Sequence, residues 1–193
     1  MSSEPGKHNI IYLDVPWWYA NRNKNTRFGG GAIGHYPLMK DKEVLAMAPQ
    51  IDELAAENCA LCMWATCPRL DFATELIKAY GFRYCTVLLH WVKLQRNGLP
   101  IFGPGTYTAS NLEVVLLGMR GSLKPVHRLT PSLIMYPRMR HSEKPPIVRD
   151  KIVHIFGDLP RIELFARHTA PGWSSQGNQV GALEYQPVLA GWK

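Results

Sequence analysis

An apolar run near the start of the chain ends abruptly in an acid, and this break constrains the fold more than any other feature. Ile10–Leu13 is apolar throughout, which is typical of a buried strand. Asp14, Val15, Pro16 and Trp17 follow directly. An isolated carboxylate is costly to bury, and large aromatic side chains beside a rigid proline form a flat wall. The pattern predicts a strand that delivers an acid and an aromatic wall to a binding site.

A planar molecule that carries an amino group suits such a site, and a nucleobase is one. Asp14 would accept one N–H of an exocyclic amine, and the backbone carbonyl of Val15 or Pro16 would accept the other. Holding both hydrogens steers the nitrogen toward a more nucleophilic geometry. Trp17 would stack on the base. On these residues alone an alternative stays open, in which Asp14 caps a turn and Trp17 belongs to the core.

Strand-like and helical patterns alternate along the chain, which favours one α/β domain with a mostly parallel sheet and helices on both faces. Ligands of such sheets bind at the carboxyl ends of the strands, where Asp14 and Arg167 are both expected. No Gly-x-Gly-x-x-Gly follows the first strand, so the NAD-type fingerprint is missing. Strands are expected at 10–13, 59–66, 84–92, 112–119, 132–136 and 161–166, and helices at 41–47, 51–57, 70–80 and 145–156.

Composition sets outer limits on these expectations. The 193 residues are expected to form a single domain over 1–193, with 1–7 and 184–193 frayed. A formal net charge of +7 fits a polyanionic partner, although basicity alone is a weak indicator. No apolar run approaches the ~20 residues of a membrane span, and no secretory signal opens the chain. We therefore expect no membrane partner and a location in the cytoplasm, or in the nucleoplasm if the host has a nucleus.

The four cysteines do not indicate a metal site. Cys59 and Cys62 have a metal-like spacing, but no second pair and no correctly spaced histidine accompany them. With Cys67 and Cys85 they are expected to be buried, reduced thiols. No metal is predicted.

Basic and aromatic residues in the loops are candidates for contacts with nucleic acid. The segment 21–34, which contains Arg27, is either a basic lid beside Asp14 or a plain surface loop. At its end, His35 and Tyr36 either border the target base or pack internally. Further cations in loops are expected to contact backbone phosphates, with a solvated basic surface as the alternative. These cations are Arg120, Lys124, Arg138 and Arg140.

One charge interrupts a later apolar run. Glu113 lies at the start of the strand expected over 112–119. It either pairs with a base or a lysine near the site, or faces solvent at the start of the strand.

The chain resembles a known family at many points. Asp14-Val15-Pro16-Trp17 resembles the Asp-Pro-Pro-aromatic signature of amino-methyltransferases that act on adenine or cytosine. More specifically, the chain is similar to the MT-A family, named for the 70-kDa catalytic subunit of the mRNA adenosine methyltransferase. Further blocks follow in family order: 34–39, 64–66, 81–84, 90–93, 113–118, 141–145, 163–167, 172–173 and 177–179.

The resemblance implies S-adenosylmethionine as the methyl donor. Lys144, in the motif that begins with Ser142, matches the position that binds the donor carboxylate. Arg167, Asn178 and Gln179 match ribose-contacting positions, and Asp14 would also hold the donor's amino group. This order places the catalytic motif before the donor-binding motif, which is the family's permuted arrangement of a Rossmann-like methyltransferase domain.

Two departures from the family pattern bear on the site. Val15 replaces the first proline of the signature, so the carbonyl is kept and the fixed φ is lost. Ala170 stands where the mRNA enzyme has an asparagine that contacts ribose, so one hydrogen bond is expected to be missing.

The implied activity is transfer of methyl to the N6 amine of adenine in nucleic acid, without a metal and on an unstacked base. DNA is favoured because the compact chain resembles the small bacterial and phage members. An RNA adenosine methyltransferase and a non-catalytic nucleic-acid-binding subunit are the alternatives. With so little chain beyond the catalytic domain, a homodimer or a partner subunit is expected to assist sequence readout.

Overall fold

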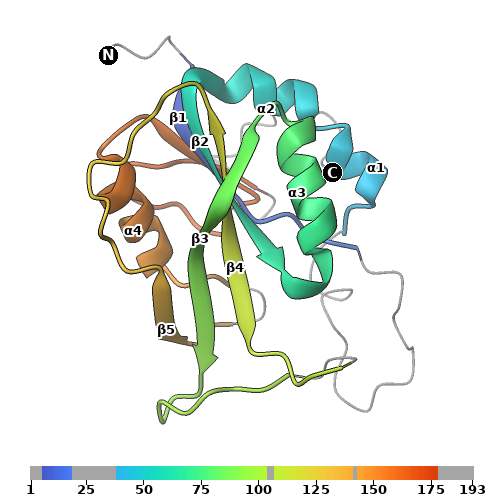
Figure 1. The fold of residues 1–193 in the computed structure, drawn as a ribbon, viewed down its shortest axis with the longest axis vertical. Helices are drawn as coiled ribbons and strands as arrows, with labels where there is room; N and C mark the ends of the chain where they lie inside the picture. The colour runs from blue at the N-terminus through green and yellow to red at the C-terminus, as the bar shows by residue number, and fades with distance from the viewer. Residues whose placement is uncertain (1–5, 19–37, 104–106, 141–142, 178–193) are drawn as a thin grey trace.

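The computed structural model describes residues 6–18, 38–103, 107–140 and 143–177, and their centre is one curled sheet (Figure 1). In this part of the chain the sheet has seven strands in the order β5-β3-β4-β2-β1-β6-β7. Every neighbouring pair is parallel except β4 with β2 and β4 with β3. The expected mostly parallel sheet is confirmed. The strands are β1 (His8–Leu13), β2 (Ala55–Thr66), β3 (Arg83–Leu94), β4 (Leu112–Arg120), β5 (Leu133–Pro137), β6 (Arg161–Leu164) and β7 (Ser174–Gln176).

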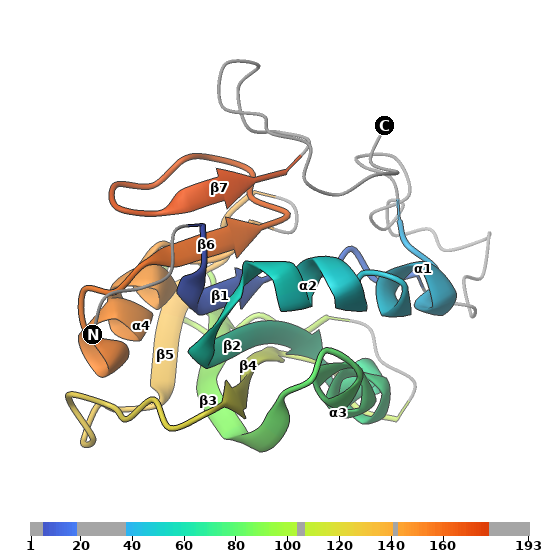
Figure 2. The ribbon, with the colours of Figure 1, turned by 90° about the horizontal axis from the view of Figure 1, so that it is seen from above.

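Helices cover both faces of the sheet, as expected (Figure 2). One face packs against α1 (Asp41–Leu45), α2 (Ala48–Leu54) and α3 (Leu70–Ala79), the last preceded by the 3-10 helix η2 (Cys67–Arg69). The other face packs against α4 (Ile147–Phe156). The sheet therefore separates two hydrophobic cores, and its central strands are buried on both sides.

Strand β1 contributes side chains to both hydrophobic cores. Ile11 and Leu13 point into the core under α1–α3, whereas Ile10 and Tyr12 point into the core under α4. All four side chains are at most 2% exposed. A strand with both faces covered reads as a continuous apolar run rather than an alternating one. Asp14 is the first residue beyond this buried strand.

Some element boundaries differ from expectation. The N-cap of α1 is Lys40 rather than Asp41, and its N–H donates to Glu43 Oε2 at 2.6 Å. Pro49 lies in the first turn of α2, where a backbone N–H would have no partner within the helix. The helix expected over 51–57 lies three residues earlier, at Ala48–Leu54, because β2 already begins at Ala55. The ends of the described elements depend on such pairing, which local propensity does not contain.

Two of the four cysteines are buried, as expected, and two are not. Cys59 and Cys62 are buried on β2, and burial raises the pKa of the Cys59 thiol to about 12. Cys67 is exposed in η2 and Cys85 is half-buried on β3, so the prediction of four buried thiols was wrong for these two. Cys67 follows the last residue of β2, where the sheet no longer covers it.

Candidate active site

The candidate site lies where the parallel strands end. Asp14 follows β1, and Arg167 follows β6, which is paired with β1 in parallel. Glu113 lies at the start of β4, and because β4 runs in the opposite direction its start lies at this same edge, beside Thr66 of β2. The segment between β5 and α4 brings in Lys144. Four separate parts of the chain thus meet at the carboxyl edge of the sheet.

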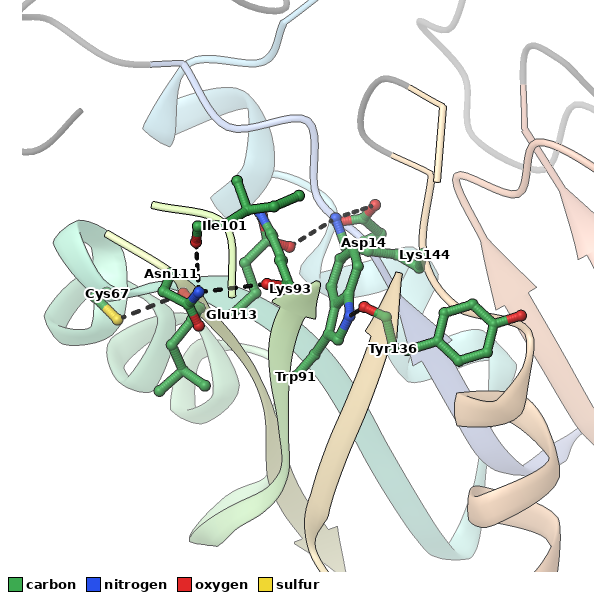
Figure 3. A network of polar contacts seen from close by, with 10 residues as sticks. Asp14, Cys67, Trp91, Lys93, Ile101, Asn111, Glu113, Tyr136 and Lys144 are labelled. Atoms are coloured by element: carbon green, nitrogen blue, oxygen red, sulfur yellow. Dashed lines mark hydrogen bonds and ion pairs between the residues drawn. The ribbon is translucent and has the colours of Figure 1, made fainter. Parts of the chain in front are cut away.

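The ammonium group of Lys144 lies between two carboxylates. Its Nζ is 3.0 Å from Asp14 Oδ2 and 3.3 Å from Glu113 Oε2. The second oxygen of Glu113 is 2.5 Å from Lys93 Nζ, so the four side chains form one alternating chain of charges (Figure 3). Lys144 Nζ also lies 5.2 Å from the centroid of the Trp64 ring, within the range of a cation–π contact. Of the two alternatives for Glu113, the structure selects pairing with lysines near the site.

Burial and pairing set the protonation of this charge chain. Burial raises the pKa of Asp14 above its ordinary value, although Lys144 opposes that rise. Burial also acts to raise the pKa of Glu113, but Lys144 and Lys93 outweigh it and the pKa is lowered. Burial acts to lower the pKa of Lys144, but Asp14 and Glu113 outweigh it and the pKa is raised. Lys144 therefore stays charged, and its charge favours the ionised form of Asp14.

A cavity of about 150 Å³ opens beside Asp14 and Lys144. Arg149 on α4 forms part of its wall and grips Glu163 with two hydrogen bonds, Nε–Oε2 at 2.5 Å and Nη2–Oε1 at 2.9 Å. Phe165 follows β6 with φ of +62°, a left-handed conformation that non-glycine residues rarely adopt. The cavity is lined by Asp14, Met139, Glu143, Lys144, Pro146, Arg149, Glu163, Phe165, Arg167 and His168.

The backbone after Asp14 is held in place by hydrogen bonds. The carbonyl of Val15 accepts from Trp17 N–H at 2.9 Å, and that of Pro16 accepts from Met39 N–H at 3.0 Å. Trp18 N–H in turn donates to the Met39 carbonyl at 3.2 Å. Since a carbonyl oxygen has two lone pairs, each retains one for a ligand. The pairing with Met39 therefore holds the backbone at Pro16 and Trp18.

Trp17 does not offer an open stacking face. Its side chain is 6% exposed and belongs to the core under α1–α3. The Arg69 guanidinium lies 5.6 Å from its ring centroid, and Phe72 packs edge-on at 6.2 Å. We therefore correct the predicted stacking role to a packing role, because the ring is already covered. The adjacent Trp18 is 41% exposed and is the aromatic of this pair that a ligand can reach.

The predicted phosphate contacts divide between the two edges of the sheet. Arg138 and Arg140 follow β5 at the carboxyl edge, whereas Arg120 ends β4 at the opposite edge, beside Cys59. There Arg120 donates to Asp52 Oδ1 at 2.8 Å and to the Tyr80 carbonyl at 3.0 Å. Lys124 is exposed in the loop that follows. At about 3.3 Å per residue, Arg120 lies roughly 23 Å from Glu113 along β4, so the structure does not bring it to the site.

Other predicted site residues lie outside the described residues. These are Arg27, His35, Tyr36, Ser142, Asn178 and Gln179, and the expected lid over 21–34 lies outside as well.

Several residues of the site were not predicted from sequence, and three of them take part in its ion pairs. Glu163, 7% exposed, interrupts the apolar strand β6 just as Glu113 interrupts β4, and this break in an apolar run was the available signal. Lys93, at the end of an apolar strand, carried a weaker signal of the same kind. Arg149 had no such signal in the sequence, because its pairing with Glu163 depends on how α4 packs beside β6.

The described residues offer neither a cluster of metal ligands nor a membrane-spanning helix. They contain no group of three or more His, Cys, Asp or Glu side chains placed to hold a metal ion. None of their helices is both long and apolar enough to cross a membrane.

A mixed sheet of this order, with a half-buried acid that pairs with a lysine at the end of β1, defines an α/β methyltransferase-like domain. The chain belongs to the MT-A70 family, whose model matches residues 8–179. It is 33% identical to the Type II methyltransferase M.MunI of a Mycoplasma species, over 90% of this chain and 78% of that protein. It is 28% identical to the human and 26% identical to the mouse N(6)-adenine-specific methyltransferase METTL4, but it spans only 38% of each.

Proposed function

We propose that this protein transfers a methyl group from S-adenosylmethionine to the N6 amine of adenine in DNA. The observation that carries the proposal is the ion pair of Asp14 with Lys144 at the carboxyl edge of the sheet. It leaves an acceptor and a cation side by side at the end of the strand that bears the family signature. The relatives named as a Type II methyltransferase and as N(6)-adenine-specific methyltransferases support the same reaction.

The described residues fit the amino-acid end of the donor. A carboxylate needs a cation and an ammonium needs an acceptor, and Lys144, Arg167 and Asp14 line one cavity. Lys144 has three N–H donors and uses two on carboxylates, which leaves one for a donor carboxylate. At about 150 Å³ the cavity is smaller than the ~300–1,000 Å³ typical of sites for whole drug-sized ligands, so these residues form part of the donor site.

The chain's own groups then act on the target amine. When bound, the donor supplies an electrophilic methyl group for in-line displacement by nitrogen. Asp14 accepts a hydrogen bond from one amine N–H and the Pro16 carbonyl accepts one from the other, which orients the nitrogen lone pair for attack. Asp14 then takes the proton that the methylated nitrogen must lose. Lys144 favours the ionised form of Asp14. This matters because a protonated carboxyl group has one acceptor fewer than a carboxylate.

The arrangement also favours an enzyme over a non-catalytic subunit. A binding subunit has no need to keep Asp14, 23% exposed, in the lining of a cavity and paired with a lysine. The proposed location is the cytoplasm, and we propose that a second copy or a partner subunit assists readout of the sequence.

A transfer assay tests the proposal. The wild type is incubated with isotopically labelled donor and with matched single-stranded DNA, duplex DNA and RNA, and nucleosides are identified by mass spectrometry. We expect N6-methyladenine in DNA. Label in no nucleoside would reject the reaction, and equal rates on RNA would reject the preference for DNA.

A further inference from the structure

A second, larger recess lies beside the active-site cavity, at the ends of β3 and β5. Its volume is about 830 Å³. Two loops form its walls, one after Leu94 and one after Pro137. The lining residues are Leu94, Gln95, Arg96, Ile101, Pro137, Arg138, Met139, Arg140 and Glu143.

Three arginines dominate the charge of this recess. Arg96, Arg138 and Arg140 are exposed, and within the described part of the chain none has a carboxylate within 4.0 Å. Other arginines are paired with acids and act as internal ties: Arg69 with Asp41, Arg120 with Asp52, Arg149 with Glu163 and Arg161 with Asp158. The cations of the recess therefore remain available to an external anion.

The loops that carry these arginines are tied to the sheet. Arg138 N–H donates to the Leu94 carbonyl at 2.9 Å, which joins the two walls of the recess. Glu143 N–H donates to the Arg140 carbonyl at 3.1 Å, and Arg140 N–H donates to Glu143 Oε2 at 3.3 Å. Fixed backbones lower the entropy cost of placing the guanidinium groups on a ligand.

The recess adjoins the active-site cavity. Met139 and Glu143 line both spaces, so a chain molecule in the recess lies within one side chain's width of the cavity that Asp14 and Lys144 also line. The apolar atoms of Leu94, Ile101 and Met139 offer contact area to bases that are not stacked in a duplex.

We propose that this recess binds the sugar–phosphate backbone of single-stranded DNA next to the target adenine. Arg96, Arg138 and Arg140 pair with successive phosphates. This inference rests on the proposed function and adds the path of the strand and its unpaired state. The volume of about 830 Å³ lies within the ~300–1,000 Å³ range of sites that take small ligands, which suits a short stretch of one strand.

The proposal is tested by binding of a fluorescently labelled single-stranded DNA of twelve nucleotides with one central adenine. Anisotropy is measured over a series of salt concentrations for the wild type and for the triple variant Arg96→Ala, Arg138→Ala, Arg140→Ala. Since each lost single-strand phosphate contact removes about 0.7 from the slope of log K against log salt, the triple variant should lose about 2. Its affinity at moderate salt should fall at least about tenfold.

Arg83→Ala is the matched control, since Arg83 is an exposed arginine at the start of β3, at the opposite edge of the sheet. It should leave both affinity and slope unchanged. Donor binding measured by calorimetry should be the same in the triple variant as in the wild type, which shows that the variant is folded.

Two results would overturn the proposal. One is a triple variant that keeps the wild-type slope, and the other is a wild type that binds a matched duplex or RNA as tightly as the single strand. Failure of the proposed function is a separate result. If the wild type binds the DNA through these arginines but methylates no adenine, the strand-binding role of the recess stands and the proposed reaction is rejected.

Discussion

The two edges of the sheet carry the same kind of ion pair in different surroundings. At the carboxyl edge Lys144 and Asp14 have side chains 15% and 23% exposed, and a second acid, Glu113, shares the lysine. At the opposite edge Arg120 pairs with Asp52, whose side chain is 71% exposed. Burial makes the first pair costly unless every charge is matched, whereas the second is largely solvated. Charged side chains that remain half-buried despite the free-energy cost of desolvation indicate a functional role. Four predictions test this contrast between the two edges.

The largest expected effect is on transfer. Asp14→Ala should lower the rate of methyl transfer by at least about 10²–10³-fold, because it removes an acceptor for the target amine. Asp52→Ala, at the opposite edge, should leave the rate unchanged. Single-turnover assays at saturating DNA measure both. Retained transfer in Asp14→Ala would reject the mechanism.

Since burial raises the pKa of Asp14, wild-type activity should fall on the acid side at a pH above the ordinary aspartate value of 3.8.

The next effect sharpens the role of the lysine. Lys144→Met keeps the volume but leaves Asp14 and Glu113 without their shared cation, so stability should fall by about 3 kcal/mol. Donor affinity should also fall, on the order of 10-fold to 100-fold, through loss of a charge-assisted contact. Arg120→Met should cost only about 0–1 kcal/mol. Urea unfolding and calorimetric titration give the two values, and equal losses of stability in the two variants would remove the distinction between the edges.

A smaller effect concerns the pH dependence of stability. The lowered pKa of Glu113 means that its pairing stabilises the fold above its ordinary pKa of 4.5, and that this is lost as the pH falls through the folded-state pKa. The raised pKa of Lys144 means that its contribution is present below 10.5 and is lost only at higher pH. Glu113→Gln should therefore cost about 1–3 kcal/mol at neutral pH and progressively less below 4.5. Melting temperatures of both proteins across this range measure the difference, and a constant gap would contradict the assignment.

The smallest effect concerns thiol reactivity. Cys67 lies exposed at the carboxyl edge, whereas burial raises the pKa of Cys59 to about 12. A disulfide reagent at neutral pH should therefore modify Cys67 in the native protein and leave Cys59 unmodified until the chain unfolds. Mass spectrometry of peptides from the treated protein identifies the modified thiols. Rapid modification of Cys59 would mean that β2 opens readily.

The sequence by itself determined much of this protein. The apolar run of β1 predicted a buried strand, and the acid after it indicated a site at the strand's end, with a turn cap as the alternative. Alternating patterns gave the α/β class, and the ordered resemblance to the MT-A family singled out Lys144. These conclusions depend on local periodicity and on the order of motifs, both of which are read along the chain.

Only the tertiary structure decided which residues meet. Sequence left the partner of Glu113 open, placed Trp17 against the base and treated Arg120 and Arg138 alike. Because β4 runs against its neighbours, its first residues join the active site and its last residue lies at the far edge. Because α3 packs over the turn after β1, Trp17 is covered. Strand direction and packing between distant segments leave no local pattern in the sequence, and they fix where each charge and each ring is placed.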